Sequence, residues 1–228
     1  MSSKFIECLI GASRPLIMEV KRRDAHGNDL LGGRSVTDVV AVFESAGAPC
    51  ISVVTGRWFG GTESMLREVT DITDRPVLQK DFITRRDQLD TAVRLGASAV
   101  LLTAALLPRS SMNNLIKASL SLGLTPFVEV TSEAEINGVL HPEECVIAVN
   151  NKDIRTGERD TGDVERSVRL LPTLTRSGTR CPVSASGIDR PEIAARLLEE
   201  GFAGLLIGTS LLRASGLQAW LDVLDRHQ

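Results

Sequence analysis

Short runs of apolar residues recur at a nearly regular interval along the chain, and turn residues bound each run. The runs are continuous rather than alternating between apolar and polar, which is typical of parallel strands that are covered on both faces. We predict eight strands on this basis: Leu16–Val20, Cys50–Thr55, Pro76–Lys80, Ala99–Thr103, Pro126–Val130, Val146–Asn150, Pro182–Ser186 and Gly204–Ile207.

Segments with a helical period separate these runs, and glycine follows several of them as a stop signal. The predicted helices are Val36–Ala46, Glu63–Val69, Arg86–Leu95, Ser111–Leu122, Glu133–Leu140, Val164–Leu171, Arg190–Glu200 and Leu211–Leu224. Eight alternations in 228 residues predict one α/β domain, residues 1–228, folded as a (β/α)8 TIM barrel. No Gly-x-Gly-x-x-Gly follows the first strand, which disfavours a dinucleotide fold.

Two segments lie outside this alternation. A short N-terminal helix is predicted over Phe5–Ala12, where it could lie across one mouth of the barrel. The longest connection, Lys21–Arg34, is polar and rich in glycine, so it is either a mobile lid over a substrate or an ordinary surface loop.

Charge and cysteine content narrow the class of partner. The net charge is −3 with both signs mixed, so neither nucleic acid nor an anionic membrane is expected to bind. The four cysteines are far apart, no apolar run is long enough to span a membrane, and the three histidines lack ligand spacing. We therefore expect a cytoplasmic monomer or small homo-oligomer with free thiols, no metal and a small-molecule partner.

Charged and amide side chains follow several strands at their carboxyl ends: Glu19 and Lys21, Lys80, Glu129, and Asn150 with Lys152. In a barrel these ends meet in one ring, where barrel enzymes place their chemistry. Glu19 and Lys21 are two residues apart, so both side chains point to the same side. Lysines and carboxylates that meet in a narrow mouth can act as acid, base or anion clamp. The alternative is a ring of stabilising ion pairs without chemistry.

Small residues end the last two strands, in Ser186-Gly187 and Gly208-Thr209-Ser210. Such residues let a ligand approach the backbone, and a phosphate cup after strands seven and eight recurs in this fold. The glycines could equally serve only to turn the chain into its next helix. The cup, if present, predicts a phosphorylated substrate.

These residues occur within longer stretches that resemble indole-3-glycerol phosphate synthase, in order, from about Phe5 to Arg213. The matching stretches are Glu19-Val20-Lys21, Ile51-Ser52-Val53-Val54-Thr55 with Phe59-Gly60-Gly61, Pro76-Val77-Leu78-Gln79-Lys80-Asp81-Phe82, Val128-Glu129-Val130, Val149-Asn150-Asn151-Lys152-Asp153-Ile154 and Ser186-Gly187-Ile188. The resemblance implies a carboxy-lyase of tryptophan or indole biosynthesis. The enzyme would cyclise, decarboxylate and dehydrate 1-(2-carboxyphenylamino)-1-deoxyribulose 5-phosphate, or a modified analogue, without cofactor or metal.

The resemblance also implies a role for each residue. Lys80 would be the general acid, Glu129 the base of the dehydration, and Lys21 a second cation oriented by Glu19. Asn150 would hold a substrate hydroxyl. The remaining substrate contacts would come from an apolar wall, a carboxylate-binding cation and the phosphate cup: Phe59, Lys152, Ser186, Gly187, Gly208 and Thr209.

Several positions depart from the family pattern. Asp24-Ala25-His26 replaces a usual Ser-Pro-Ser, Ala185 a glutamate, and Lys152 an arginine. Asp24 would put a like charge near the substrate's carboxylate, at a cost of about 1 kcal/mol if the two groups approach within a few Å. The chain is thus interpreted as a divergent member, acting on a modified anthranilate or another aryl or amino partner in specialised metabolism. Two alternatives stay open, a phosphosugar isomerase or epimerase and a catalytically silent paralogue that binds a phosphorylated metabolite.

Overall fold

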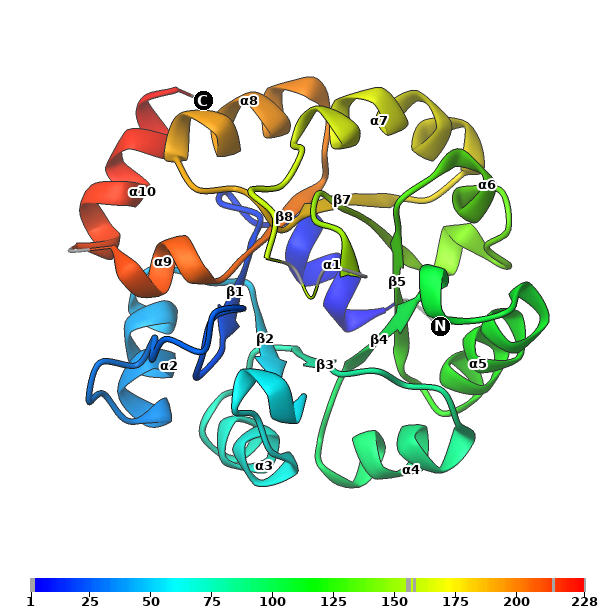
Figure 1. The fold of residues 1–228 in the computed structure, drawn as a ribbon, viewed down its shortest axis with the longest axis horizontal. Coiled ribbons are helices and arrows are strands. Elements are labelled where there is room, and N and C mark those ends of the chain that lie inside the picture. The colour runs from blue at the N-terminus through cyan, green and yellow to red at the C-terminus, as the bar shows by residue number, and fades with distance from the viewer. Residues whose placement is uncertain (1–2, 155–156, 158, 215, 228) are drawn as a thin grey trace.

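The computed structural model describes residues 3–154, 157, 159–214 and 216–227. Eight parallel strands pair in chain order from β1 to β8, and β8 pairs with β1 to close the barrel. Helices surround the strands (Figure 1). The strands are β1 Leu16–Val20, β2 Cys50–Val54, β3 Val77–Lys80, β4 Ala99–Thr103, β5 Thr125–Val130, β6 Val146–Asn150, β7 Cys181–Ala185 and β8 Gly204–Ile207. The predicted (β/α)8 barrel is confirmed, with every strand end within one residue of its expected position.

The helices follow the same alternation. They are α1 Lys4–Ile10, α2 Val36–Ser45, α3 Glu63–Ile72, α4 Arg86–Arg94, α5 Arg109–Ser121, α6 Glu133–Ile136, α7 Glu165–Ser177, α8 Pro191–Glu200, α9 Thr209–Arg213 and α10 Leu217–Arg226. Short 3-10 turns occupy Arg57–Phe59, Ala104–Leu106 and Pro142–Glu144.

Four predicted helices differ in extent from the structure, and the first of them, α3, continues three residues past Val69 to Ile72. The segment Leu211–Leu224 is two helices, α9 and α10, with Gly216 as the N-cap of the second. Helix α6 stops four residues short of Leu140, with Asn137 as its C-cap and Gly138, a poor helix former, directly after it. Helix α7 continues six residues past Leu171, because it accommodates Pro172 in its interior.

The barrel has an inner and an outer apolar core, as the period of two along each strand dictates. In β1, Leu16, Met18 and Val20 pack outward against the helices, whereas Ile17 faces the barrel interior. Glu19 is the next inward position. Each strand therefore presents its last inward residue at the carboxyl-terminal mouth, above a packed apolar floor.

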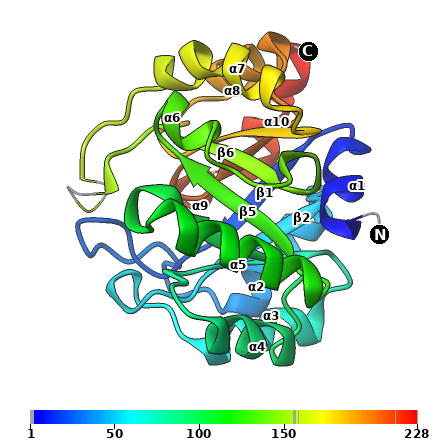
Figure 2. The same ribbon diagram turned by 90° about the vertical axis from the view of Figure 1, so that its right-hand side faces the viewer.

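Helix α1 closes the amino-terminal mouth, which confirms the expectation that it lies across one end. Phe5 and Leu9 are fully buried, and the Phe5 ring meets Phe127 edge to face with 6.3 Å between centroids. A Cβ atom on Gly204 would lie 2.8 Å from a methyl carbon of Leu9, so this close contact requires glycine. Figure 2 shows α1 at the end of the barrel opposite the long loops. Across the described ranges, no helix is both long and apolar enough to cross a membrane.

Candidate active site

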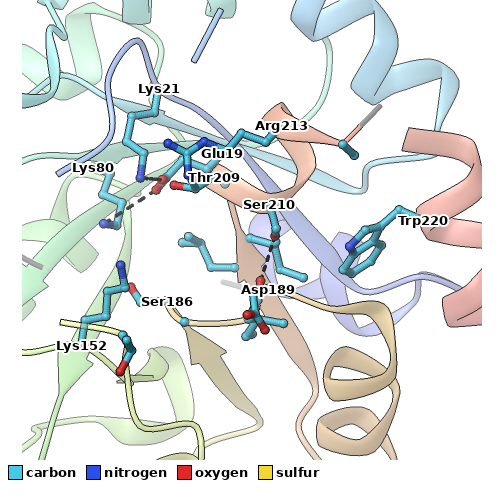
Figure 3. Close-up of a pocket in the computed structure, with 17 residues that line it drawn as sticks. Glu19, Lys21, Lys80, Lys152, Ser186, Asp189, Thr209, Ser210, Arg213 and Trp220 are labelled. Carbon is cyan, nitrogen blue, oxygen red and sulfur yellow. Dashed lines mark hydrogen bonds and ion pairs between the residues drawn. The ribbon is translucent and has the colours of Figure 1, made fainter. Parts of the chain in front are cut away.

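Glu19 lies between two lysines at the carboxyl-terminal mouth. Lys21 Nζ is 3.1 Å from Glu19 Oε1, and Lys80 Nζ is 3.7 Å from Glu19 Oε2 (Figure 3). All three side chains are at least nine-tenths buried. Burial favours the neutral acid, but the charges of Lys21 and Lys80 outweigh it, so the pKa of the Glu19 carboxyl lies below its ordinary value. Glu19 is therefore an anion at neutral pH that holds two ammonium groups in place.

A cavity of about 460 Å³ opens beside this cluster. Its lining combines the lysines with the residues that follow β7 and β8: Glu19, Lys21, Lys80, Lys152, Ser186, Gly187, Gly208, Thr209 and Arg213 are among them. This volume is in the range of small-molecule sites. The predicted phosphate cup and the predicted lysines thus face one space.

The end of β8 approaches Glu19 very closely. A Cβ atom on Gly208 would lie 2.6 Å from Glu19 Oε1, so only glycine fits there. On the neighbouring strand end, Ser186 has a left-handed φ of 66°, an uncommon conformation for a residue with a side chain. Ser210 Oγ donates a hydrogen bond to the Ile188 carbonyl at 2.8 Å, which ties the loop after β7 to α9.

A second, smaller cavity of about 20 Å³ lies on the other side of Lys80. Glu129 lines it together with aromatic and aliphatic groups: Val54, Trp58, Phe59, Phe82, Leu101 and Ile154. The Trp58 and Phe82 rings are 4.9 Å apart, and Lys21 Nζ lies 5.3 Å from the centroid of the Phe59 ring. Lys80 therefore lines both this small cavity and the larger cavity that the predicted phosphate-binding residues line.

Asn150, which ends β6, and Asn151, which follows it, have different surroundings. Asn151 accepts a hydrogen bond from Ser167 Oγ and donates to Ser184 Oγ and the Ser186 carbonyl, so it fixes the loop after β7. Asn150 Oδ1 accepts from the backbone N–H of residue 152, but its buried Nδ2 has no hydrogen-bond partner in the described part of the chain. An unsatisfied buried donor costs about 1–3 kcal/mol, so a ligand that accepts from Asn150 would be favoured.

The sequence model of the family described as indole-3-glycerol phosphate synthase matches residues 3–224. The chain belongs to this family. An indole-3-glycerol phosphate synthase of an Exiguobacterium species is 37% identical over 202 residues, which are 87% of this chain and 76% of the relative. Those of Thermococcus kodakarensis and Pyrococcus furiosus are 34% and 35% identical, and the matches cover 91% and 86% of those relatives and 92% and 88% of this chain.

Ala185 and Asp24, two positions where the chain departs from the synthase pattern, are both buried in the structure. Ala185 is fully buried at the end of β7, in register with Asn150 on β6, and belongs to the inner apolar core. Asp24 is buried beneath the surface of its loop and pairs with Arg213 on α9. The charge of Asp24 is thus compensated within the protein, which removes the reason to expect it to repel a substrate carboxylate.

Hydrogen bonds saturate the Asp24 carboxylate. It accepts from the N–H groups of His26 and Asn28 and from Asn28 Nδ2, each at 2.9 Å, and also pairs with Arg213. Burial alone would raise the pKa of Asp24, but these donors and the Arg213 charge lower it to about 2. Asp24 is therefore ionised throughout the neutral range.

The depressed pKa of Asp24 predicts how stability depends on acidity. A carboxyl whose pKa falls from 3.8 to about 2 on folding stabilises the protein above pH 3.8, and this contribution is lost as the pH falls through 2. We expect Asp24→Asn to lower the free energy of unfolding by about 1–2 kcal/mol at pH 7. Urea unfolding at several pH values checks this, since the difference from wild type should shrink between pH 4 and 2. A difference that is constant with pH would contradict it.

The structure adds residues that the sequence analysis did not assign to the site. Phe82 and Arg213 line the two cavities, and neither was among the expected contacts. Phe82 follows the Lys80-Asp81 pair and could have been found as the first aromatic residue past the strand. Arg213 is one helical turn beyond Thr209, a relation that appears only once α9 is known to begin there.

One histidine and two glutamates lie close together away from this mouth. His141, Glu143 and Glu144 each offer a ligand atom, within 4.8 Å of one another, in the turn that precedes β6. These side chains are partly or fully exposed, and they lie at the amino-terminal end of the strand whose other end carries Asn150.

Proposed function

We propose that the protein is a carboxy-lyase of the indole-3-glycerol phosphate synthase type. Its reaction would convert 1-(2-carboxyphenylamino)-1-deoxyribulose 5-phosphate, or an analogue with a modified aryl ring, into an indole glycerol phosphate, carbon dioxide and water. The observation that supports this most directly is the place of Lys80, which lines both the apolar cavity and the cavity with the phosphate cup. A substrate with an aryl ring at one end and a phosphate at the other would put its central ketone at this lysine.

Ring closure needs a proton at the ketone oxygen. In the proposed reaction the aryl carbon that bears the carboxylate attacks the ketone carbon, and the oxygen takes a proton from Lys80. Lysine is charged near neutral pH unless strongly desolvated, and Glu19 stabilises that charge at 3.7 Å. Loss of carbon dioxide then returns the electron pair to the ring and restores its aromaticity.

Dehydration needs an acid and a base. The new hydroxyl would leave as water after protonation by one of the lysines, and Glu129 would take the proton lost from the adjacent ring carbon. Glu129 is 2% exposed and lines the same small cavity as Lys80. At about 20 Å³ this cavity has room for about one water, so side chains of its wall, such as the exposed Trp58, would have to move to bring a ring intermediate within reach of both groups. Lys21 would stay beside Glu19 and the phosphate.

Substrate binding would use the remaining expected residues. Phe59, which lines the smaller cavity, would pack on the aryl ring, and Lys152, which lines the larger one, would attract the carboxylate. Asn150 lines neither cavity and would donate to a hydroxyl from its buried, unpartnered Nδ2. Ser186, Gly187, Gly208 and Thr209 would surround the phosphate at the ends of β7 and β8. We infer a place in tryptophan biosynthesis or a specialised indole pathway, in the cytoplasm.

The family match does not favour the isomerase or the silent paralogue. An isomerase would also leave Lys80, Lys21 and Glu129 without a reason to occur together. Incubation with the unmodified substrate, with indole absorbance and carbon dioxide release followed together, tests the proposal. Release of both in equal amounts is the expected result. Failure with this substrate and with ring-substituted analogues would overturn it, whereas turnover of an analogue alone would identify a divergent specificity.

Tryptophan fluorescence should report the aryl end of the site separately. The chain has two tryptophans, Trp58, which is 60% exposed, and Trp220, which is 9% exposed. In Trp220→Phe, emission from Trp58 is expected to shift to the blue on addition of benzoate, an aryl carboxylate without an indole ring, because an aryl ring beside it would exclude water. Trp58→Phe is the matched control. Unchanged Trp58 emission at a saturating benzoate concentration would remove this residue from the aryl site.

A further inference from the structure

Two arginines join the loop after β1 to α9. Arg213, the last residue of α9, pairs with Asp24 in the loop. Arg34, at the end of the loop, donates to the loop carbonyls of Leu30 and Leu31 and to the carbonyl of Leu212 on α9, at 2.7–2.9 Å. The loop and α9 are therefore cross-linked at two places on the same side of the cavity.

Backbone hydrogen bonds within the loop fix its conformation, so the loop can hold Asp24 in one place. Asp24 N–H donates to the Asn28 carbonyl, Leu30 N–H donates to the Arg22 carbonyl, and Arg23 forms an antiparallel bridge with Asp29. The Asp24 side chain is 7% exposed, whereas that of Arg213 is 53% exposed. A fixed, buried carboxylate thus orients a cation that would otherwise sample many rotamers.

Arg213 also faces the phosphate side of the cavity. It lines the cavity together with Gly208 and Thr209, and it lies one turn along the helix from Thr209. Figure 3 shows its side chain beside Thr209, near Lys21 and Glu19. Lys21 shares its charge with Glu19 at 3.1 Å and Arg213 shares its charge with Asp24, but the guanidinium keeps further N–H donors that a phosphate oxygen can accept.

We propose that Arg213 binds the substrate's phosphate and that Asp24 is the positioning residue that holds the Arg213 guanidinium at the cavity. This rests on the phosphorylated substrate of the proposed function. It gives Asp24 a purpose at the position where the sequence departs from the family's Ser-Pro-Ser. The guanidinium can meet Asp24 with one nitrogen and a phosphate oxygen with another, because it carries five N–H donors in a planar fork.

Inorganic phosphate is the probe, because it binds without turnover. Isothermal titration at low ionic strength should give a Kd about tenfold higher for Arg213→Met than for wild type, and about threefold to tenfold higher for Asp24→Asn. Asp29→Asn is the matched control, because Asp29 accepts N–H groups within the same loop at Leu31 and Gly32, with no hydrogen bond to α9 among the described residues. It should bind phosphate as wild type does. Arg213→Lys keeps the charge without the fork and should give an intermediate Kd.

Kinetics separate binding from a purely structural role. In Arg213→Met and Asp24→Asn we expect KM to rise by the same factors as the phosphate Kd, with kcat within about threefold of wild type. Wild-type phosphate affinity in Arg213→Met and Arg213→Lys, an equal loss in Asp24→Asn and Asp29→Asn, or no phosphate binding by the wild type would each overturn the inference. Phosphate binding that depends on Arg213 without turnover of any arylamino substrate would sustain this inference and refute the proposed function.

Discussion

Lys80→Met is expected to lower kcat by about a thousandfold while the protein stays folded. General acid catalysis contributes about 10²–10⁴ in rate, and methionine has similar length and packing without a proton to donate. Lys80 lines both cavities, and no other described lysine does. No other lysine is therefore placed to donate the proton in its absence. Steady-state assay of indole formation, with the phosphate Kd measured in parallel, checks this prediction.

The phosphate Kd of this variant should stay within a few-fold of wild type, because Lys21 and Arg213 still face the cup. Lys117→Met, on the exposed face of α5, is the matched control and should keep full activity. A Lys80→Met enzyme that keeps a tenth of its kcat would exclude the lysine as the acid that drives ring closure.

Glu19→Gln is expected to lower kcat by about a hundredfold. Glutamine keeps the shape of the side chain but removes the charge that Lys21 and Lys80 share, so two ammonium groups would face each other without an anion between them. Because the pKa of Glu19 is below its ordinary value, the wild-type residue is ionised over the whole neutral range. The loss should therefore be of similar size at every pH between 6 and 8.

Glu68→Gln on α3 provides the comparison, since this exposed carboxylate lies outside both cavities. Rates within threefold of wild type for Glu19→Gln would mean that the two lysines keep their positions without it. The side-chain amide would then be a sufficient acceptor, and the charge of Glu19 would have no part in catalysis.

The ring at the carboxyl-terminal mouth could be predicted from the sequence because strand periodicity is a strict geometric rule. Glu19 and Lys21 are two residues apart and meet, and the residues at the ends of β3, β5 and β8 follow from the barrel alone. The apolar runs are continuous and well bounded by turn residues, so their ends could be read to within one residue.

The contacts of the loop after β1 could not be predicted in the same way. Asp24 and Arg213 are 189 residues apart, and nothing local to either position indicates the other. Periodicity also ran through the break between α9 and α10, because Leu211, Ala214, Leu217 and Leu221 follow one another at intervals of three or four residues across it. In one continuous helix Arg213 would be interpreted as a surface residue in the middle of that helix. Its position at the cavity could therefore not be predicted from the sequence.

The amino-terminal mouth gives the molecule a second, independent end. Leu9 fills the space that the missing side chain of Gly204 leaves, four residues before Gly208 meets Glu19 on the same stretch of chain. The apolar floor of the barrel, at Gly204, and the mouth that carries Glu19, at Gly208, thus lie at opposite ends of β8. Cys8 and Ile10 on α1, where substitutions for heat resistance could be tried, therefore lie at the end of the barrel opposite the proposed catalytic groups.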